Sequence, residues 1–139
     1  MGEVIRFGVS IDEKLLRRFN KLISHKGYTN RSEAIRDLIR EHLVEEEWDK
    51  EDKETVGTIN LVYNHETREL TDTLIDLQHH YCSEIISTMH IHLDEHNCLE
   101  VLIVKGKAKK IREIADKLIS TKGVKYGRLT AATSGKELT

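Results

Sequence analysis

Hydrophobic and polar residues alternate strictly over the first stretch of the chain, VIRFGVSI at positions 4–11. Side chains point to opposite faces of a strand in turn, so this pattern predicts a strand with one apolar and one polar face. The apolar face comprises Ile5, Phe7, Val9 and Ile11, and the polar face comprises Arg6, Gly8 and Ser10.

The pattern then changes to that of two amphipathic helices. Apolar residues at helical spacing begin near Asp12 and stop near Gly27. The next segment, TNRSEAIRDLIREHL at 29–43, opens with Asn30 as N-cap and Glu33 three residues later, as in a capping box. One strand and two helices bury too little apolar surface to fold alone. We therefore expect a second copy of the chain, whose strand pairs with this one antiparallel.

Two strands paired in this way would form a ribbon that fits the major groove of B-DNA. Arg6, Gly8 and Ser10 of each chain would face the bases, although Gly8 offers no polar side chain there. The free N–H groups at the start of the second helix suit a backbone phosphate, which indicates contacts through Asn30, Arg31 and Ser32. An ordinary dimerisation hairpin is the alternative.

An acidic segment, EEEWDKEDKE at 45–54, separates this part from the rest. Residues 5–45, with the segment NRSEAIRDLIR, resemble a ribbon-helix-helix DNA-binding domain. We predict such a domain over residues 1–48, a linker over 49–54 and a second domain, for metal binding and tetramerisation, over 55–139. Two successive strand–helix–strand patterns in the second domain predict a ferredoxin-like, ACT-like βαββαβ sandwich, which makes the protein α+β. The expected elements are strands at 54–64, 85–94, 98–106 and 123–133 and helices at 67–82 and 107–121.

Composition narrows the class of protein. With 38% hydrophobic and 33% charged residues, the chain of 139 residues is globular rather than disordered. It has no apolar run that could span a membrane, and its first residues are interpreted as a strand rather than a signal peptide. Two cysteines are too few for a disulfide framework, so we expect a cytoplasmic protein. Residues 1–40 hold nine Lys and Arg against five Asp and Glu. That local positive charge indicates an anionic partner, or serves solubility alone.

Residues suited to metal binding are concentrated in one segment. Five of the eight histidines and both cysteines lie between His79 and Cys98. His90 and His92 are two apart on a predicted strand and so share a face, and the short turn after them lets Cys98 face the same site. Imidazole nitrogen and thiolate sulfur are ligands for a borderline or soft divalent metal. The intervening apolar residues are expected in the core: Met89, Ile91 and Leu93.

Three ligands leave a fourth position open. The preceding helix supplies His79, His80 and Cys82 as candidates. His80 lies beside the predicted buried stripe, whereas His79 and Cys82 lie on a face better suited to a partner. A histidine from a neighbouring subunit would make metal binding depend on assembly. A single histidine on a strand is better interpreted as a polar group with its hydrogen bonds made. The H-x-H pair followed by a cysteine favours a metal site instead.

The segments NRSEAIRD, QHH and MHIHLDEHNCLE, in this order, resemble the NikR family of nickel-responsive repressors, and the resemblance covers residues 5 to about 133. It implies a homotetramer in which a metal-binding core is flanked by two DNA-binding dimers. It also implies one Ni(II) per subunit, bound in a plane by His90, His92 and Cys98 of one chain and His79 of another. Nitrogen and sulfur donors in a plane suit Cu(II) as well, so only the resemblance favours nickel. The implied function is nickel-dependent repression of nickel uptake genes.

Further residues carry over from the resemblance. Glu33 and Asp37 match a pair that the family uses for a weaker cation site, with carboxylates that merely face Arg36 and Arg40 as the alternative. Gln78 and Glu100 are expected to orient the metal ligands through hydrogen bonds.

One expected DNA contact departs from the family pattern. Arg68 would contact a phosphate, but Thr67 stands where relatives often carry a second basic residue. His96 receives no ligand role.

Other classes of protein fit less of the chain. A hydrolytic metalloenzyme would need a placed general base and an open coordination position. A metal-independent ribbon-helix-helix repressor explains the first 45 residues and leaves the His and Cys pattern to chance. A regulator that senses an amino acid would need a ligand-binding turn, and the segment TREL at 67–70 lacks the glycines of such sites.

Overall fold

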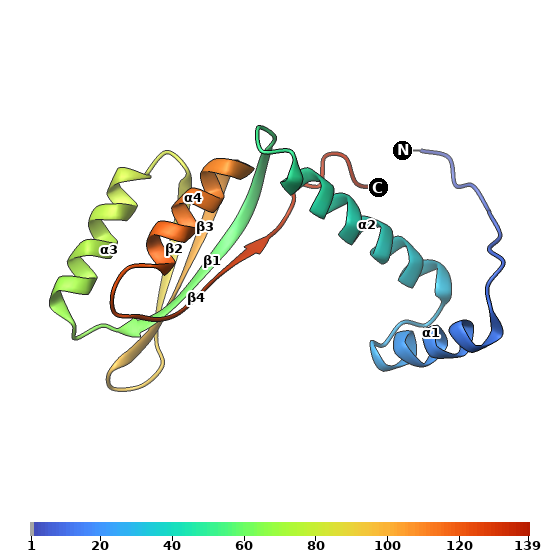
Figure 1. Ribbon diagram of the computed structural model, residues 1–139, viewed down its shortest axis with the longest axis horizontal. Helices are drawn as coiled ribbons and strands as arrows, with labels where there is room; N and C mark the ends of the chain where they lie inside the picture. Colours follow the sequence, from blue (N-terminus) through green and yellow to red (C-terminus); the bar gives the residue numbers. More distant parts are fainter. Residues whose placement is uncertain (1) are drawn as a thin grey trace. The chain divides into compact units, whose positions relative to one another are not determined.

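The computed structural model describes residues 2–139 and divides the chain into two compact units. One unit runs to Leu43 and includes Gly135–Thr139, and the other comprises Val44–Ser134. Figure 1 shows the elements of both units in chain order.

The first unit contains the helices that the sequence predicts. Helix α1 spans Glu13–His25, and the carboxylate of Asp12 accepts hydrogen bonds from the first N–H groups of that helix. Helix α2 begins at Arg31, and the Asn30 side chain accepts the Glu33 N–H at 2.9 Å, which confirms Asn30 as the cap.

Residues 2–12 lack helix or strand in the single chain. The predicted strand therefore stays unpaired, and its apolar side chains are in water, with Ile5 78% and Phe7 70% exposed. A strand requires a hydrogen-bonding neighbour, and the neighbour expected from the sequence is a second copy of the chain. Several apolar residues of the two helices are exposed as well: Leu15, Leu22, Leu38, Ile39 and Leu43.

Helix α2 is longer than the sequence indicates. It spans Arg31–Asp49, so its last residues belong to the second unit, and the boundary falls after Leu43 rather than after Trp48. The reason is Trp48, whose ring is buried in the core of the second unit and whose Nε1–H donates to the Ala132 carbonyl at 2.9 Å.

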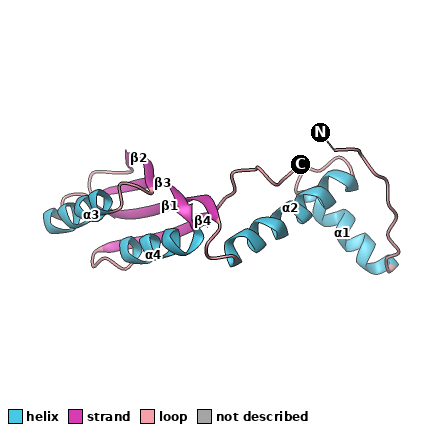
Figure 2. Ribbon diagram, turned by 90° about the horizontal axis from the view of Figure 1, so that it is seen from above, coloured by secondary structure: helices cyan, strands magenta, loops and turns pink. Residues whose placement is uncertain are grey.

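The second unit is a four-stranded antiparallel sheet with two helices. Its strands are β1 (Glu54–Asn64), β2 (Ile85–His92), β3 (Asn97–Lys107) and β4 (Val124–Ala131), and its helices are α3 (Arg68–His80) and α4 (Ala108–Ile119). The strand order β2-β3-β1-β4 is that of the ferredoxin-like βαββαβ sandwich, which confirms the predicted fold class. Figure 2 distinguishes the sheet from its helices by colour.

One face of the sheet forms the core. Residues of β1 alternate strictly between buried and half-buried, and the buried set packs with β3, α3 and α4. Helix α4 buries five residues, whereas α3 buries only Leu70 and Leu74.

The face of β2 that is turned away from the helices contradicts the expectation that its apolar residues lie in the core. Met89, Ile91 and Leu93 are 61%, 41% and 53% exposed, so they are not part of the core of this chain. Both helices cover the other face, and nothing within residues 2–139 covers this one. The prediction of a strand with an apolar face was correct, but which face the helices cover could not be known from one strand alone.

Candidate metal centre and DNA-binding surface

Two neighbouring strands bring three candidate ligands to one face of the sheet. His92 on β2 lies directly opposite Cys98 on β3, and His90 lies opposite Glu100. Residues opposite each other in an antiparallel pair share a face, as do residues two apart on one strand. The ring centroids of His90 and His92 are 5.5 Å apart. The structure thus confirms that the H-x-H pair and the cysteine share a face.

Cys98 is fully buried at the centre of this arrangement. Its thiol donates to the Tyr63 carbonyl at 3.4 Å. Burial raises the pKa of the Cys98 thiol, the Tyr63 hydrogen bonds lower it, and the nearby Glu100 carboxylate raises it further, with a net upward shift. The thiol is therefore protonated at neutral pH and becomes a strong sulfur ligand only when a cation replaces its proton.

Glu100 connects the strands to helix α3. Its carboxylate accepts hydrogen bonds from the Tyr63 hydroxyl at 3.0 Å and from the Gln78 amide, and it lies 3.4 Å from Nδ1 of His90. Glu100 is 6% exposed, and its contact with Tyr63 is buried, whereas Gln78 and His90 are partly open to solvent. With Nδ1 of His90 turned towards Glu100, its Nε2 would be the nitrogen available for a metal.

Tyr63 is a member of this network that the sequence did not indicate. Its ring is buried and lies edge-on to His90, and burial beside the Glu100 carboxylate raises the pKa of its hydroxyl. Tyr63 reads as an ordinary apolar position of β1, and only the strand register places it opposite Cys98.

The turn that leads to Cys98 is fixed by Asp94. Its carboxylate accepts the N–H groups of His96 and Asn97 and the Asn97 side-chain amide. These hydrogen bonds lower the pKa of Asp94 to about 2, and those from Asn97 contribute more than the one from the His96 N–H. Nδ1 of His96 lies 3.0 Å from the Glu66 carboxylate.

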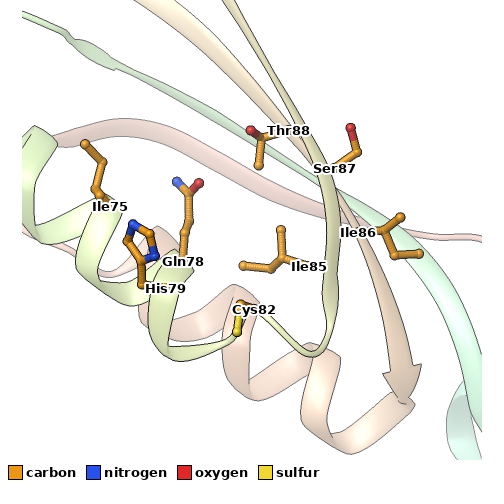
Figure 3. A pocket seen from close by; sticks show the side chains of 8 residues that line it. All are labelled: Ile75, Gln78, His79, Cys82, Ile85, Ile86, Ser87 and Thr88. Carbon is orange, nitrogen blue, oxygen red and sulfur yellow. The ribbon is translucent and has the colours of Figure 1, made fainter.

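His79 lies apart from the other three candidates. It is exposed in the last turn of α3, next to Gln78, and both line a surface pocket of about 280 Å³ with Cys82 and residues of β2. Figure 3 shows His79 and Gln78 on the helix and Cys82 just after it. His79 thus occupies the outward face that the sequence analysis assigned to a partner chain.

Within residues 2–139, no three His, Cys, Asp or Glu side chains converge closely enough to hold a metal ion. The donors nevertheless fit a nickel-type ion, because two imidazoles and a thiol share one face and one imidazole already has an acceptor for its second nitrogen.

The carboxylates of the expected second cation site are engaged by other groups. Asp37 accepts hydrogen bonds from the Tyr28 hydroxyl and from Arg40, and Glu33 lies 3.0 Å from Arg36. The Tyr28 hydrogen bond, and then that of Arg40, lowers the pKa of Asp37. The carboxylates face arginines, as in the alternative interpretation, and a cation there would have to displace them.

The residues expected to contact DNA are at the surface of their units. Arg6, Gly8 and Ser10 are exposed on the unpaired segment, and Arg68 is exposed as the first residue of α3. Near the start of α2, Ser32 is exposed, the Asn30 side chain is engaged as the helix cap, and Nε of Arg31 donates to Asn20 of α1.

Comparison with known proteins agrees with this arrangement. Residues 56–132 match the NikR C terminal nickel binding domain, and residues 5–46 match the ribbon-helix-helix proteins of the copG family. The chain belongs to the NikR family. Its relatives include proteins described as nickel-responsive regulators from Geotalea uraniireducens, 61% identical, and from Thermococcus kodakarensis, 59% identical. The first match covers 99% of both chains, and the second covers 98% of this chain and 99% of the relative.

Family membership decides between the classes considered above. NikR proteins are transcription regulators with a ribbon-helix-helix DNA-binding domain and a nickel-binding domain, which excludes an enzyme and a repressor without a metal domain. A solved structure of an uncharacterized protein from Thermotoga maritima shares the fold alone, with a TM-score of 0.53 and 15% identity over 58% of this chain and 100% of that one. Among the described residues, every helix is too short or too polar to cross a lipid bilayer.

Proposed function

We propose that this protein is a cytoplasmic repressor whose operator affinity rises when Ni(II) binds between subunits. His90, His92 and Cys98 of one chain and His79 of another would hold one nickel ion per subunit. The observation that carries the proposal is the chain of contacts from the ligand face to the ligand helix: His90 lies beside Glu100, which accepts a hydrogen bond from Gln78, the residue before His79.

Helix α3 is suited to be the element that responds to the metal. Only Leu70 and Leu74 of the helix are fully buried, and in its last turn Leu77 and Gln78 are half-buried while His79 and His80 are exposed. Elements with few buried apolar contacts open at low free-energy cost. Nickel bound by His79 would therefore order this helix, and an ordered helix would favour one assembled state over others.

The exposed apolar surfaces support self-association. The ribbon segment carries one such surface, and β2 carries another in Met89, Ile91 and Leu93. Large contiguous apolar patches mark association sites in soluble proteins. Two independent surfaces on each chain would give a dimer of dimers, the homotetramer that the NikR resemblance implies.

Operator recognition would use the paired ribbons. Arg6 and Ser10 of each chain would read base edges with Gly8 between them, and Asn30, Arg31, Ser32 and Arg68 would contact the DNA backbone. Two dimers held in one tetramer would bind two half-sites with higher avidity than either dimer alone. Nickel uptake genes would be the natural targets of such a repressor. A second, weaker cation at Glu33 and Asp37 would have to displace Arg36 and Arg40 from these carboxylates.

Complementation between inactive variants tests the shared site. His79→Ala and Cys98→Ala proteins are each expected to lose tight nickel binding. When the two are unfolded together and refolded as mixed oligomers, the His79 of one chain can complete the intact cluster of the other, so part of the nickel binding returns. A mixture that binds no more nickel than the separate variants, although mass spectrometry shows mixed oligomers, contradicts a site built from two chains.

The ion that raises operator affinity distinguishes a nickel sensor from a copper sensor. Both ions suit nitrogen and sulfur donors in a plane. If Cu(II), but not Ni(II), increased operator affinity at stoichiometric loading, the sensor would respond to copper.

A further inference from the structure

The imidazole of His65 contains a buried nitrogen without a partner. Among the side chains of residues 2–139, its Nδ1 is the buried polar atom for which the structure offers no hydrogen bond. Such atoms are costly and are rarely retained in folded proteins without a compensating role. No role was expected for His65 from the sequence.

The fold fixes His65 on the ligand side of the sheet. It follows directly after β1, two residues beyond Tyr63, which lies opposite Cys98. Its main chain is held on both sides: the N–H donates to the His96 carbonyl at 3.0 Å, and the carbonyl accepts the Thr71 hydroxyl at 3.4 Å. The backbone at His65 is therefore anchored beside the metal face, and its ring can turn about the side-chain bonds.

The nearest ring to His65 is that of the candidate ligand His92. Their centroids are 4.7 Å apart, with the planes at 89°. At this separation, rotation of either ring brings a nitrogen of each within hydrogen-bond distance of the other.

The two candidate histidine ligands differ in what supports them. A ligating imidazole commonly donates its second ring N–H to an acceptor, which fixes its tautomer and orientation. His90 has such an acceptor in Glu100, at 3.4 Å from Nδ1. The side-chain contacts that the structure gives for His92 are with the rings of His65 and His90. The unpartnered nitrogen of His65 is the acceptor that His92 would need.

We propose that His65 is a positioning residue for the nickel ligand His92. When His92 binds the metal through one nitrogen, its other N–H donates to Nδ1 of His65. The buried acceptor is unpaired in the metal-free chain and becomes paired on metal binding. This inference rests on the proposed nickel site and adds a residue that does not touch the metal.

Nickel titration of four proteins tests the proposal: wild type, His65→Leu, His65→Gln and the matched control His96→Ala. Each is titrated with Ni(II) against a competing chelator, its thiolate-to-nickel absorption band is recorded, and thermal unfolding is measured without metal. We expect His65→Leu to weaken nickel binding by about 10- to 100-fold and to shift the absorption band, as loss of such a supporting group does at other metal sites. The amide oxygen of His65→Gln should restore most of the affinity, and His96→Ala should match wild type.

The metal-free measurement separates positioning from folding. Because Nδ1 has no partner in the metal-free chain, an apolar side chain of similar size should not lower the melting temperature. Unchanged nickel affinity in His65→Leu, or equal losses in His65→Leu and His65→Gln, would overturn the proposal. Those results would leave the shared site intact, whereas nickel binding that is retained in the His79→Ala and Cys98→Ala variants would overturn the proposed function as well.

Discussion

Gln78 of helix α3 donates a hydrogen bond to the buried carboxylate of Glu100 on β3. This bond joins the helix that carries His79 to the strand opposite His90. Any movement of the end of α3 must break or stretch it. The contact therefore gives a physical route by which occupation of the ligand face can change the order of α3.

Removal of the Gln78 side chain tests this connection. We expect Gln78→Ala to weaken nickel binding by about 10- to 100-fold, the loss typical when a group that supports a metal ligand is removed. Chelator competition measures it. Asp76→Ala, an exposed change on the same helix, should leave the affinity unchanged. Wild-type affinity in Gln78→Ala would show that the bond to Glu100 is incidental.

Phe7 lies at the centre of the exposed apolar face of the ribbon segment. A lysine there would place a charge between two paired ribbons, so Phe7→Lys should abolish dimerisation of the first unit and operator binding. Nickel binding should persist, because the candidate ligands belong to the second unit. On the same sample, sedimentation measures dimerisation, a gel shift measures operator binding, and a titration measures nickel binding. Phe7→Lys that still binds operator would contradict a paired ribbon.

The lowered pKa of Asp94 predicts that the stability of the turn before Cys98 depends on pH. Its pKa is lowered to about 2 in the folded chain, so the group binds its proton more readily when unfolded. Its contribution to stability is therefore complete above the ordinary aspartate pKa of about 4 and is lost as the pH falls towards 2. The protection of the His96 and Asn97 amides against hydrogen exchange, relative to their intrinsic rates, should fall over that range. Asp94→Ala should show the lower protection already at neutral pH and no further loss between about pH 4 and 2.

Gly127 in β4 is required for the approach of α4. A Cβ at this position would lie 2.6 Å from Cγ1 of Ile119, closer than side chains pack. We expect Gly127→Ala to destabilise the second unit by about 1–3 kcal/mol, since overpacking of a core contact has that cost. Chemical denaturation measures it. Ile119→Ala in the same chain should recover part of the loss, and strictly additive effects of the two changes would contradict direct contact.

The secondary structure was largely predictable because its signals are local. Alternation over 54–64 gave β1 with its exact limits, and Asn30 gave the start of α2. The end of α2 was not predictable, because the segment after Leu43 reads as acidic and polar while its Trp48 packs against residues distant in sequence.

The candidate site was predictable in part for the same reason. Two-residue spacing places His90 and His92 on one face, and a short turn brings Cys98 opposite. The roles of Tyr63 and His65 depend on the register of β1 against β3, which no local pattern encodes. The face of β2 that lies in the core was also wrongly predicted, because His90 and His92 share the face of buried β3 residues while the apolar Met89 and Ile91 are exposed on the other face.

Operator binding with and without stoichiometric nickel tests the central claim most directly. Metal-free wild-type protein and His90→Ala are compared on an upstream region of nickel transport genes, at fixed salt. Nickel should tighten specific binding by wild type by about 5- to 150-fold, the usual range of coupling between two sites, and leave His90→Ala unchanged. Equal affinity of wild type with and without nickel would contradict the account and assign the histidine and cysteine cluster to stability or storage.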